Sequence, residues 1–288
     1  MNRLEGTAAV PGGNVWFKLI GGGRGLPLLV IHGGPGFPHN YLGSLGRLAD
    51  SREVIFWDQL GCGRSESPSN AELWTMRRSV AELRAVISAL NLDRFHLYGH
   101  SFGGMLAQQY VLDAPPQAVS LILSNSLASM QKFAQDVAYL KSLLDPATQS
   151  VIDHHESAGT TDSDDYQAAC KTWFETYICR VLPWPAELEH SINNVGVQIY
   201  ETMFGPSEFS INGNLRTWDI LDRLAEICLP SLIIAGTFDE CTPDHMWEMH
   251  RRIKGSRFAL FTGSAHMPFI EQPERFDRCM RDFLSAHD

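Results

Sequence analysis

The segment Gly99-His100-Ser101-Phe102-Gly103-Gly104 constrains the fold of this 288-residue chain more than any other feature. It follows the apolar run Phe95–Tyr98, which is typical of a buried strand, and precedes residues 105–112, whose apolar positions have helical spacing. A G-x-S-x-G sequence between a strand and a helix is typical of a nucleophile on a sharp turn, because residues without side chains let the two elements approach. Ser101 is therefore the predicted nucleophile of a hydrolytic enzyme.

Short apolar runs and helical patterns alternate on both sides of this segment. The predicted strands are residues 28–31, 54–57, 95–98, 121–123, 231–235 and 258–261. The predicted helices beside them are residues 79–90, 105–112 and 274–284. Such alternation predicts an α/β fold, in which helices flank a mostly parallel sheet.

The strand pattern is interrupted in the middle of the chain. Aromatic and charged residues recur at helical intervals through 133–144 and 166–181. We interpret residues 129–217 as an inserted helical cap, so that residues 1–128 and 218–288 form one α/β core. The acidic stretch at 160–165 is predicted to be a solvated loop that caps the following helix.

A serine hydroxyl is a weak nucleophile unless a histidine base, held by an acid, removes its proton. In the fold that carries this turn, the order along the chain is serine, acid, histidine. Asp239 follows the strand at 231–235 and His266 follows the strand at 258–261, so both are expected at the carboxyl edge of the sheet, where ligands bind. Asp58 is the best alternative acid, but it precedes Ser101.

Four further histidines are weaker candidates for the base. His32 and His100 flank the predicted loops of the site and are interpreted as packed, hydrogen-bonded side chains. His245 and His250 lie in a helical stretch after Pro243, where a solvated helix face is expected.

The sequence His32-Gly33-Gly34-Pro35-Gly36 directly follows the strand at 28–31. Glycines at this point let backbone amides face a reacting carbonyl with no Cβ in the way. We predict an oxyanion hole made by the amides of Gly34 and Phe102, the latter at the start of the helix after Ser101. The alternative is an ordinary Gly/Pro turn.

Composition excludes several other classes of protein. Lys and Arg number 23 against 33 Asp and Glu, a formal charge of −10, whereas a nucleic-acid-binding protein needs a basic face. No apolar run approaches the length of a membrane helix, and the N-terminal sequence lacks the apolar region of a secretory signal, so no membrane association and a cytoplasmic location are expected. The six cysteines form no C-x-x-C pair, and neither a metal nor an organic cofactor is expected.

These motifs resemble those of the proline iminopeptidase family of α/β-hydrolases, which includes related aminopeptidases and amino-acid amidases. The resemblance rests on four segments, which are residues 32–36 (HGGPG), 57–65 (WDQLGCGRS), 99–104 and 263–267 (GSAHM). It extends over nearly the whole chain and is weakest between about 129 and 195. It implies the α/β-hydrolase fold with an inserted cap and no cofactor.

In the tricorn-associated members of that family, two glutamates hold the free amino group of the substrate. Glu208 and Glu240, the latter directly after Asp239, match these positions. The resemblance thus implies cleavage of the amide bond after a free N-terminal residue, in a short peptide or an amino-acid amide, through an acyl-enzyme. Two positions depart from the family pattern, since His100 stands where many members have Gly or Ser, and Phe102 where many have Trp or Tyr.

Two other functions remain open at this point. An esterase or lactonase would use the same three catalytic residues, because the fold does not fix the leaving group. A ligand receptor with a hydrolase fold is a further alternative, although a complete set of catalytic residues argues against it. The preferred N-terminal residue and the oligomeric state are not predicted.

Overall fold

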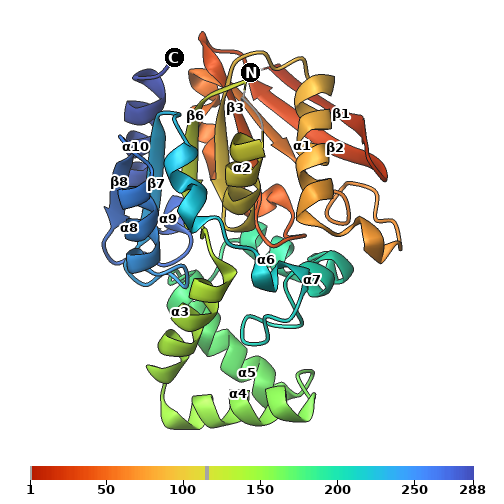
Figure 1. Ribbon diagram of the computed structural model, residues 1–288, viewed down its shortest axis with the longest axis vertical. Helices are drawn as coiled ribbons and strands as arrows, with labels where there is room; N and C mark the ends of the chain where they lie inside the picture. Colours follow the sequence, from red (N-terminus) through yellow and green to blue (C-terminus); the bar gives the residue numbers. More distant parts are fainter. Residues whose placement is uncertain (1, 114–116) are drawn as a thin grey trace.

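Among residues 2–113 and 117–288, which the computed structural model describes, eight strands form one sheet in the order β1-β2-β4-β3-β5-β6-β7-β8 (Figure 1). The strands are β1 (Asn2–Val10), β2 (Gly13–Gly21), β3 (Gly25–Ile31), β4 (Arg52–Trp57), β5 (Phe95–His100), β6 (Ala118–Ser124), β7 (Ser231–Gly236) and β8 (Arg257–Phe261). The β1–β2 and β2–β4 pairs are antiparallel, and the other neighbouring pairs are parallel. The prediction of a mostly parallel α/β sheet is confirmed.

The six predicted strands lie within β3 to β8, whereas β1 and β2 were not predicted. These two strands form an antiparallel hairpin at one edge of the sheet. Their sequences carry charged residues such as Glu5 and Lys18 between apolar ones, and most of their residues are only partly buried. An edge hairpin of this kind lacks the continuous apolar run that marked the central strands.

The helices that flank the sheet are α1 (Met76–Ala89), α2 (Phe102–Asp113), α8 (Pro243–Arg252), α9 (Pro268–Glu271) and α10 (Pro273–Ser285). Helices rather than strands fill the chain between β6 and β7, namely α3 (Met130–Ser142), α4 (Pro146–Ala158), α5 (Asp164–Trp173), α6 (Ala186–Asn193) and α7 (Val197–Met203). In Figure 1, α4 and α5 project away from the sheet, and α6 and α7 lie between them and the sheet. The domain division at 129 and 217 stays a prediction.

Other helical segments do not have α-helical geometry. These are the 3-10 segments His39–Asp50, Ala71–Leu73, Asn214–Thr217 and Leu221–Glu226, and a π-helical turn at Phe174–Ile178. The predicted acidic loop is shorter than expected, because Asp164 and Asp165 already lie in the first turn of α5; the Ser163 side chain accepts a hydrogen bond from the amide of Tyr166 and so caps the helix, as predicted.

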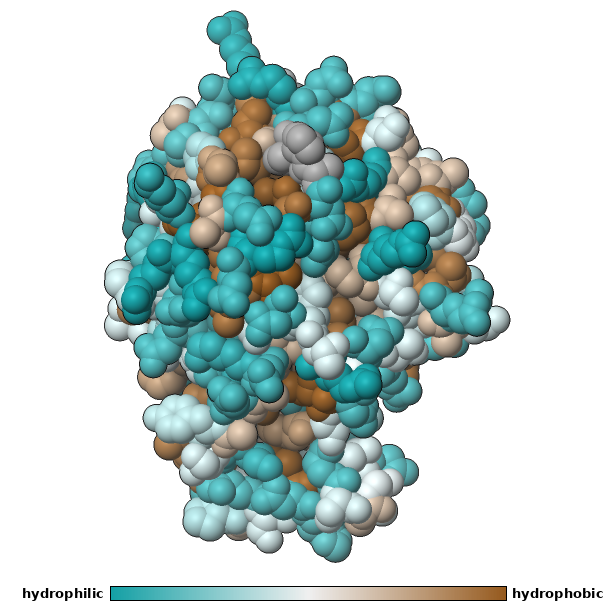
Figure 2. Space-filling view, in the orientation of Figure 1, coloured by the Kyte–Doolittle hydropathy of each residue, from teal (hydrophilic) through white to brown (hydrophobic). Residues whose placement is uncertain are grey.

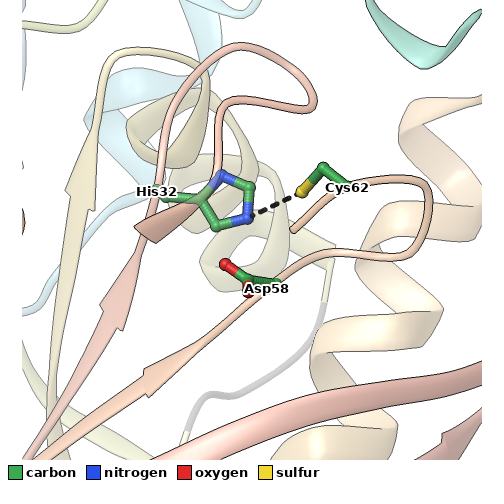
Figure 3. Close-up of side chains that lie close together, drawn as sticks. All are labelled: His32, Asp58 and Cys62. Carbon is green, nitrogen blue, oxygen red and sulfur yellow. Dashed lines mark hydrogen bonds between the residues drawn. The ribbon is translucent and has the colours of Figure 1, made fainter. Parts of the chain in front are cut away.

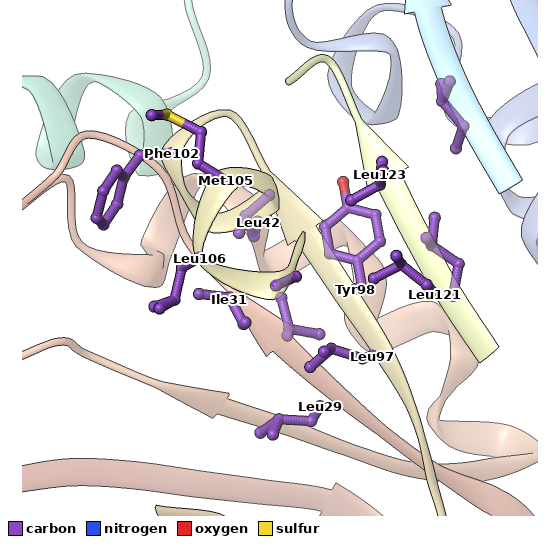
Figure 4. Close-up of a cluster of buried hydrophobic side chains, with 14 of the residues drawn as sticks. Leu29, Ile31, Leu42, Leu97, Tyr98, Phe102, Met105, Leu106, Leu121 and Leu123 are labelled. Atoms are coloured by element: carbon purple, nitrogen blue, oxygen red, sulfur yellow. The ribbon is translucent and has the colours of Figure 1, made fainter. Parts of the chain in front are cut away.

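Buried apolar side chains surround the turn between β5 and α2 (Figure 4). They come from three parallel strands and from α2, and they include Leu29, Ile31, Leu97, Leu121, Leu123, Met105 and Leu106, each no more than 2% exposed. Burial of one such side chain stabilises the fold by about 1.5–3 kcal/mol. The turn that carries Ser101 is therefore fixed on a closely packed base.

Hydrophilic side chains cover most of the face seen in Figure 2, and hydrophobic side chains are exposed there mainly in small areas between them. In the described part of the chain, no helix combines the length and the apolar character that crossing a membrane requires.

Candidate active site

Ser101 lies on a strained turn between the end of β5 and the start of α2. Its φ is +54°, a left-handed conformation that is uncommon for a residue with a side chain. Its amide donates hydrogen bonds of 3.1 Å to the carbonyl oxygens of Ser124 and Asn125. A Cβ on Gly103 would lie 2.3 Å from the Ile31 oxygen, so the close approach of α2 to β3 requires glycine there. This is the geometry expected for a nucleophile elbow.

Asp239 and His266 lie together in loops at the carboxyl ends of β7 and β8. Nδ1 of His266 is 2.7 Å from Oδ1 of Asp239, and both residues are buried. The same Asp239 oxygen accepts a hydrogen bond from the amide of Cys241 at 2.9 Å. Since a carboxylate only accepts, Nδ1 of His266 carries the proton and Nε2 is left as the basic nitrogen.

Ser101 and His266 line one cavity of about 420 Å³. In the described ranges, no hydrogen bond joins Ser101 Oγ to His266 Nε2, and such bonds are often long until substrate binds. Aromatic and aliphatic side chains make up much of the cavity wall, and many of them come from the segment between β6 and β7, including Tyr166, Trp173, Phe174, Ile178, Ile192, Val195 and Phe209. The cavity can therefore hold an apolar molecule that carries few polar groups.

The amides of Gly34 and Phe102 are available as donors. Neither donates a hydrogen bond to any residue in 2–113 or 117–288. Gly34 has a φ of +108°, and a Cβ there would lie 2.6 Å from the amide nitrogens of Gly36 and Phe37, so only glycine fits this loop. The predicted oxyanion hole stays a prediction, and the geometry is compatible with it.

Glu208 and Glu240 both contribute to the cavity wall. Glu240 is 5% exposed, and its Oε1 lies 3.9 Å from Nε2 of His266. Its Oε2 is buried with no hydrogen-bond partner among the described residues. Oε1 of Glu208 accepts a hydrogen bond from the Tyr200 hydroxyl at 2.6 Å. Glu208 is partly exposed, whereas the burial of Glu240 and its Oε2 is not that of a solvated surface carboxylate.

Burial raises the pKa of both carboxyl groups. For Glu240, the charges of Glu208 and Asp239 raise the pKa further, and the nearby indole N–H of Trp173, which makes no hydrogen bond within the described residues, opposes this only in part. For Glu208, the Tyr200 hydroxyl and His266 oppose the effect of burial. The two carboxyl groups line one cavity, and the charge of each disfavours ionisation of the other, so a bound cation would favour ionisation of both.

We expect Glu240→Gln to stabilise the ligand-free protein at neutral pH. Because the pKa of Glu240 is raised in the folded state, the folded protein binds this proton more tightly than the unfolded chain does. Stability is thus lost as pH rises from the ordinary value of 4.5 through the raised folded-state pKa. Thermal unfolding followed by circular dichroism should show a variant Tm higher by about 2 °C or more at pH 7.

The gain in Tm should shrink as pH falls toward 4, since the wild-type group is then protonated in both states. A variant Tm that is lower than that of the wild type at pH 7 would contradict the raised pKa of Glu240.

Sequence reasoning missed Asn125, which directly follows β6. Its Nδ2 donates a 2.6 Å hydrogen bond to Oδ2 of Asp239 and a 3.3 Å hydrogen bond to the oxygen of Ala265, the residue before His266. Asn125 has a φ of +52° and is fully buried. The signal that could have indicated it is an asparagine directly after β6, because β6 is the neighbour of β7, the strand that Asp239 follows.

We expect Asn125→Ala to lower kcat by about 10- to 100-fold with little change in KM, because it removes a hydrogen bond to a buried carboxylate that orients His266. The control is Asn91→Ala, which replaces an exposed asparagine with a similar φ of +51° and so matches the backbone strain. Steady-state kinetics of both variants test this, and equal kcat values would remove the proposed role of Asn125.

Three of the four histidines that are weaker candidates for the base are buried. His32 and His100 are buried and hydrogen-bonded, as predicted. The prediction of a solvated face for His245 is wrong. His245 is fully buried, with Nδ1 3.1 Å from Asp136 and Nε2 accepting from the amide of Ala128 at 3.2 Å. Helical spacing alone did not reveal that His245 of α8 contacts Asp136 of α3 and the backbone of Ala128 before that helix.

Asp58, the alternative acid, belongs to a structural cluster with His32 and Cys62 (Figure 3). The Asp58 carboxylate accepts from the amide and ring of His39, at 2.9 and 2.7 Å. Nε2 of His32 accepts from the amide of Gln59 at 2.8 Å, and burial lowers the pKa of His32 to about 4. These atoms are already satisfied within the protein, so the cluster joins two loops and leaves no open ligand set for a metal.

A second group that combines metal-ligand types is Asp239, Cys241 and His266. Asp239 and His266 already share a hydrogen bond, and burial raises the pKa of the Cys241 thiol well above its usual value. A neutral thiol is a weak metal ligand. The arrangement fits an acid–base pair better than a metal centre.

The fold and the site together define a serine-type hydrolase of the α/β-hydrolase class. The family model described as the α/β hydrolase fold matches residues 27–273. A proline iminopeptidase of Heyndrickxia coagulans is 40% identical over 284 residues, covering 98% of this chain and 99% of that protein. The chain belongs to the proline iminopeptidase family of α/β-hydrolases.

Solved structures agree with this assignment. The crystal structure of proline iminopeptidase from Mycobacterium smegmatis has a TM-score of 0.91 and 35% identity, covering 99% of this chain and 98% of that one. The crystal structure of VinJ has a TM-score of 0.95 and 31% identity, with 99% of each chain covered. The protein is an enzyme of the peptidase type, and these relatives do not favour the esterase alternative.

Proposed function

We propose that the protein cleaves the amide bond that follows a free N-terminal amino acid, in short peptides or amino-acid amides. The observation that carries this proposal is the buried Glu240 carboxylate, whose Oε2 has no partner in the described part of the chain and whose Oε1 lies 3.9 Å from His266. An unpaired buried carboxylate costs several kcal/mol, roughly, which a substrate ammonium group would offset.

Glu240 and Glu208 are proposed to bind this ammonium group together. Both line the cavity that also contains Ser101, so a bound amino group would place the first carbonyl carbon near the nucleophile. An uncharged or acylated amine would leave the carboxylates unpaired. This arrangement explains why an exopeptidase would reject internal peptide bonds.

The reaction is proposed to proceed in two stages. Nε2 of His266 takes the Ser101 proton while Oγ attacks the carbonyl carbon, and the Gly34 and Phe102 amides donate to the oxyanion. Asp239 keeps the imidazole in the required tautomer and stabilises its cation. His266 then protonates the departing amine, and water releases the amino acid by the same route. The chemistry requires no metal or organic cofactor.

The proposed cap, residues 129–217, supplies Glu208 and many of the apolar side chains of the cavity wall. It would therefore set both the amino-group preference and the size of substrate that enters. The expected cytoplasmic location stays a prediction.

The proposal is tested by comparing an aminoacyl-arylamide with its N-acetyl form, for several amino acids including proline, alanine and phenylalanine. The free-amine substrates are expected to react at least about 100-fold faster, since acetylation removes the charge that the two glutamates bind. Equal rates would contradict amino-group recognition, and hydrolysis of esters that lack an amino group, without cleavage of any arylamide, would favour an esterase.

A further inference from the structure

Tyr41 and His100 lie beside the proposed catalytic residues but are not assigned to any step of the reaction. Tyr41 comes from the segment His39–Asp50, and His100 is the last residue of β5. Both side chains are almost completely buried, and both contribute to the wall of the catalytic cavity. Their hydrogen bonds form one continuous chain.

The chain of hydrogen bonds begins at the oxyanion loop. The amide of Gly33 donates to the Tyr41 hydroxyl oxygen at 2.8 Å. The Tyr41 oxygen is 2.8 Å from Nδ1 of His100, and Nε2 of His100 is 2.9 Å from the carbonyl oxygen of His266. Gly33 precedes the proposed donor Gly34, and His100 precedes Ser101. The chain therefore connects the oxyanion loop, the nucleophile turn and the catalytic histidine.

The direction of each hydrogen bond is fixed. The carbonyl of His266 only accepts, so Nε2 of His100 carries the proton. Burial lowers the pKa of His100 well below its usual value, and the nearby His266 lowers it further. Neutral His100 must then accept at Nδ1, so the Tyr41 hydroxyl donates to it. Burial also raises the pKa of Tyr41, which keeps that proton in place.

Ring packing supports the same contact. The rings of His100 and His266 have centroids 4.5 Å apart at an interplanar angle of 62°, and the ring of Phe269 packs edge-on against His100 at 5.1 Å. During the reaction His266 becomes positively charged, so a neutral His100 adds no repulsion beside it.

We propose that Tyr41 and His100 are positioning residues that hold the oxyanion loop and His266 in register with Ser101. The inference rests on the proposed role of Ser101 as nucleophile. The attacking oxygen, the base and the oxyanion donors come from three separate loops, and catalytic groups must be placed to within about 0.5 Å. A single buried hydrogen-bond chain that contacts all three loops meets this requirement.

The first test is Tyr41→Phe, which removes only the hydroxyl. We expect kcat on an aminoacyl-arylamide to fall at least about tenfold, with KM changed less than about threefold, because substrate still binds but the reacting groups are misplaced. The control is Tyr177→Phe, which removes another buried hydroxyl; this one makes one hydrogen bond, to the Leu140 oxygen at 3.2 Å, where that of Tyr41 makes two. Tyr177 does not contribute to the wall of the cavity.

The second measurement is the rate at which a fluorophosphonate probe labels Ser101. This rate depends on the base and the oxyanion hole and not on the natural substrate, and we expect it to fall in Tyr41→Phe in parallel with kcat. A wild-type protein that is labelled but cleaves no arylamide would overturn the proposed substrate class. The labelling rate alone would then test the positioning role of Tyr41 and His100. A labelling rate and a kcat of Tyr41→Phe that both stay within about twofold of wild type would overturn the proposed positioning role.

A pair of variants at His100 covers the case in which Tyr41→Phe fails to fold. His100→Gln keeps one donor and one acceptor, whereas His100→Leu keeps neither. We expect Gln to retain at least about tenfold more labelling rate than Leu. Equal rates in the two folded variants would show that His100 only fills space and would overturn the proposal.

Discussion

Ser101→Ala is expected to lower kcat by at least about 10⁴-fold on every substrate that the protein cleaves. Alanine removes the oxygen proposed to form the acyl-enzyme, and it leaves the proposed oxyanion donors, the amides of Gly34 and Phe102, in place. The remaining rate should therefore come only from positioning of the substrate and from stabilisation of the oxyanion. KM should change little, because Oγ is not proposed to bind the ground state. Steady-state kinetics and fluorophosphonate labelling of the same preparations measure both effects.

The matched control is Ser157→Ala, which replaces an exposed serine on α4. This variant should keep wild-type kcat and labelling. Residual activity above about 1% in Ser101→Ala, with an unchanged circular dichroism spectrum, would show that another group attacks the substrate. A folded wild-type protein that is not labelled would favour the receptor alternative.

The central strands could be predicted because each is buried on both faces. Residues 28–31 are a continuous apolar run, residues 95–98 are interrupted only by His96, and both runs lie in β3 and β5 with almost no exposed surface. The edge hairpin β1–β2 could not be predicted in the same way. Most of its residues are partly buried or exposed, and its pairing depends on contacts that local sequence does not record.

The loop positions of the site also followed from the sequence. Ser101, Asp239 and His266 each lie within about five residues of the end of a predicted strand, and parallel strands bring their carboxyl ends to one edge. The residues that position them did not follow, because Asn125 and Tyr41 act through hydrogen bonds to segments far away in the sequence. Such contacts become visible only when the strand order is known.

Glu240→Gln is expected to lower kcat/KM for free-amine substrates by about 10²- to 10³-fold. The glutamine cannot carry the charge that offsets a buried ammonium group, although its shape is nearly unchanged. The rate on the N-acetyl substrate should stay the same or rise slightly, since no unpaired carboxylate then faces the acetyl group. The preference for a free amine should therefore be largely lost. Glu208→Gln should act in the same direction and more weakly, because the Tyr200 hydroxyl already binds Glu208.

The matched control for both variants is Glu189→Gln, which replaces an exposed glutamate on α6 outside the cavity wall.

The decline of activity at low pH gives an independent criterion. Because burial raises the pKa of Glu240, kcat/KM for a free-amine substrate should begin to fall at a higher pH than an ordinary carboxyl group would cause, and Glu240→Gln should remove that part of the decline. If Glu240→Gln lowers the rates on free-amine and N-acetyl substrates by the same factor, Glu240 acts on His266 and does not recognise the amine. The distance of 3.9 Å between Glu240 Oε1 and His266 Nε2 makes this the outcome that the experiment must separate from ammonium binding.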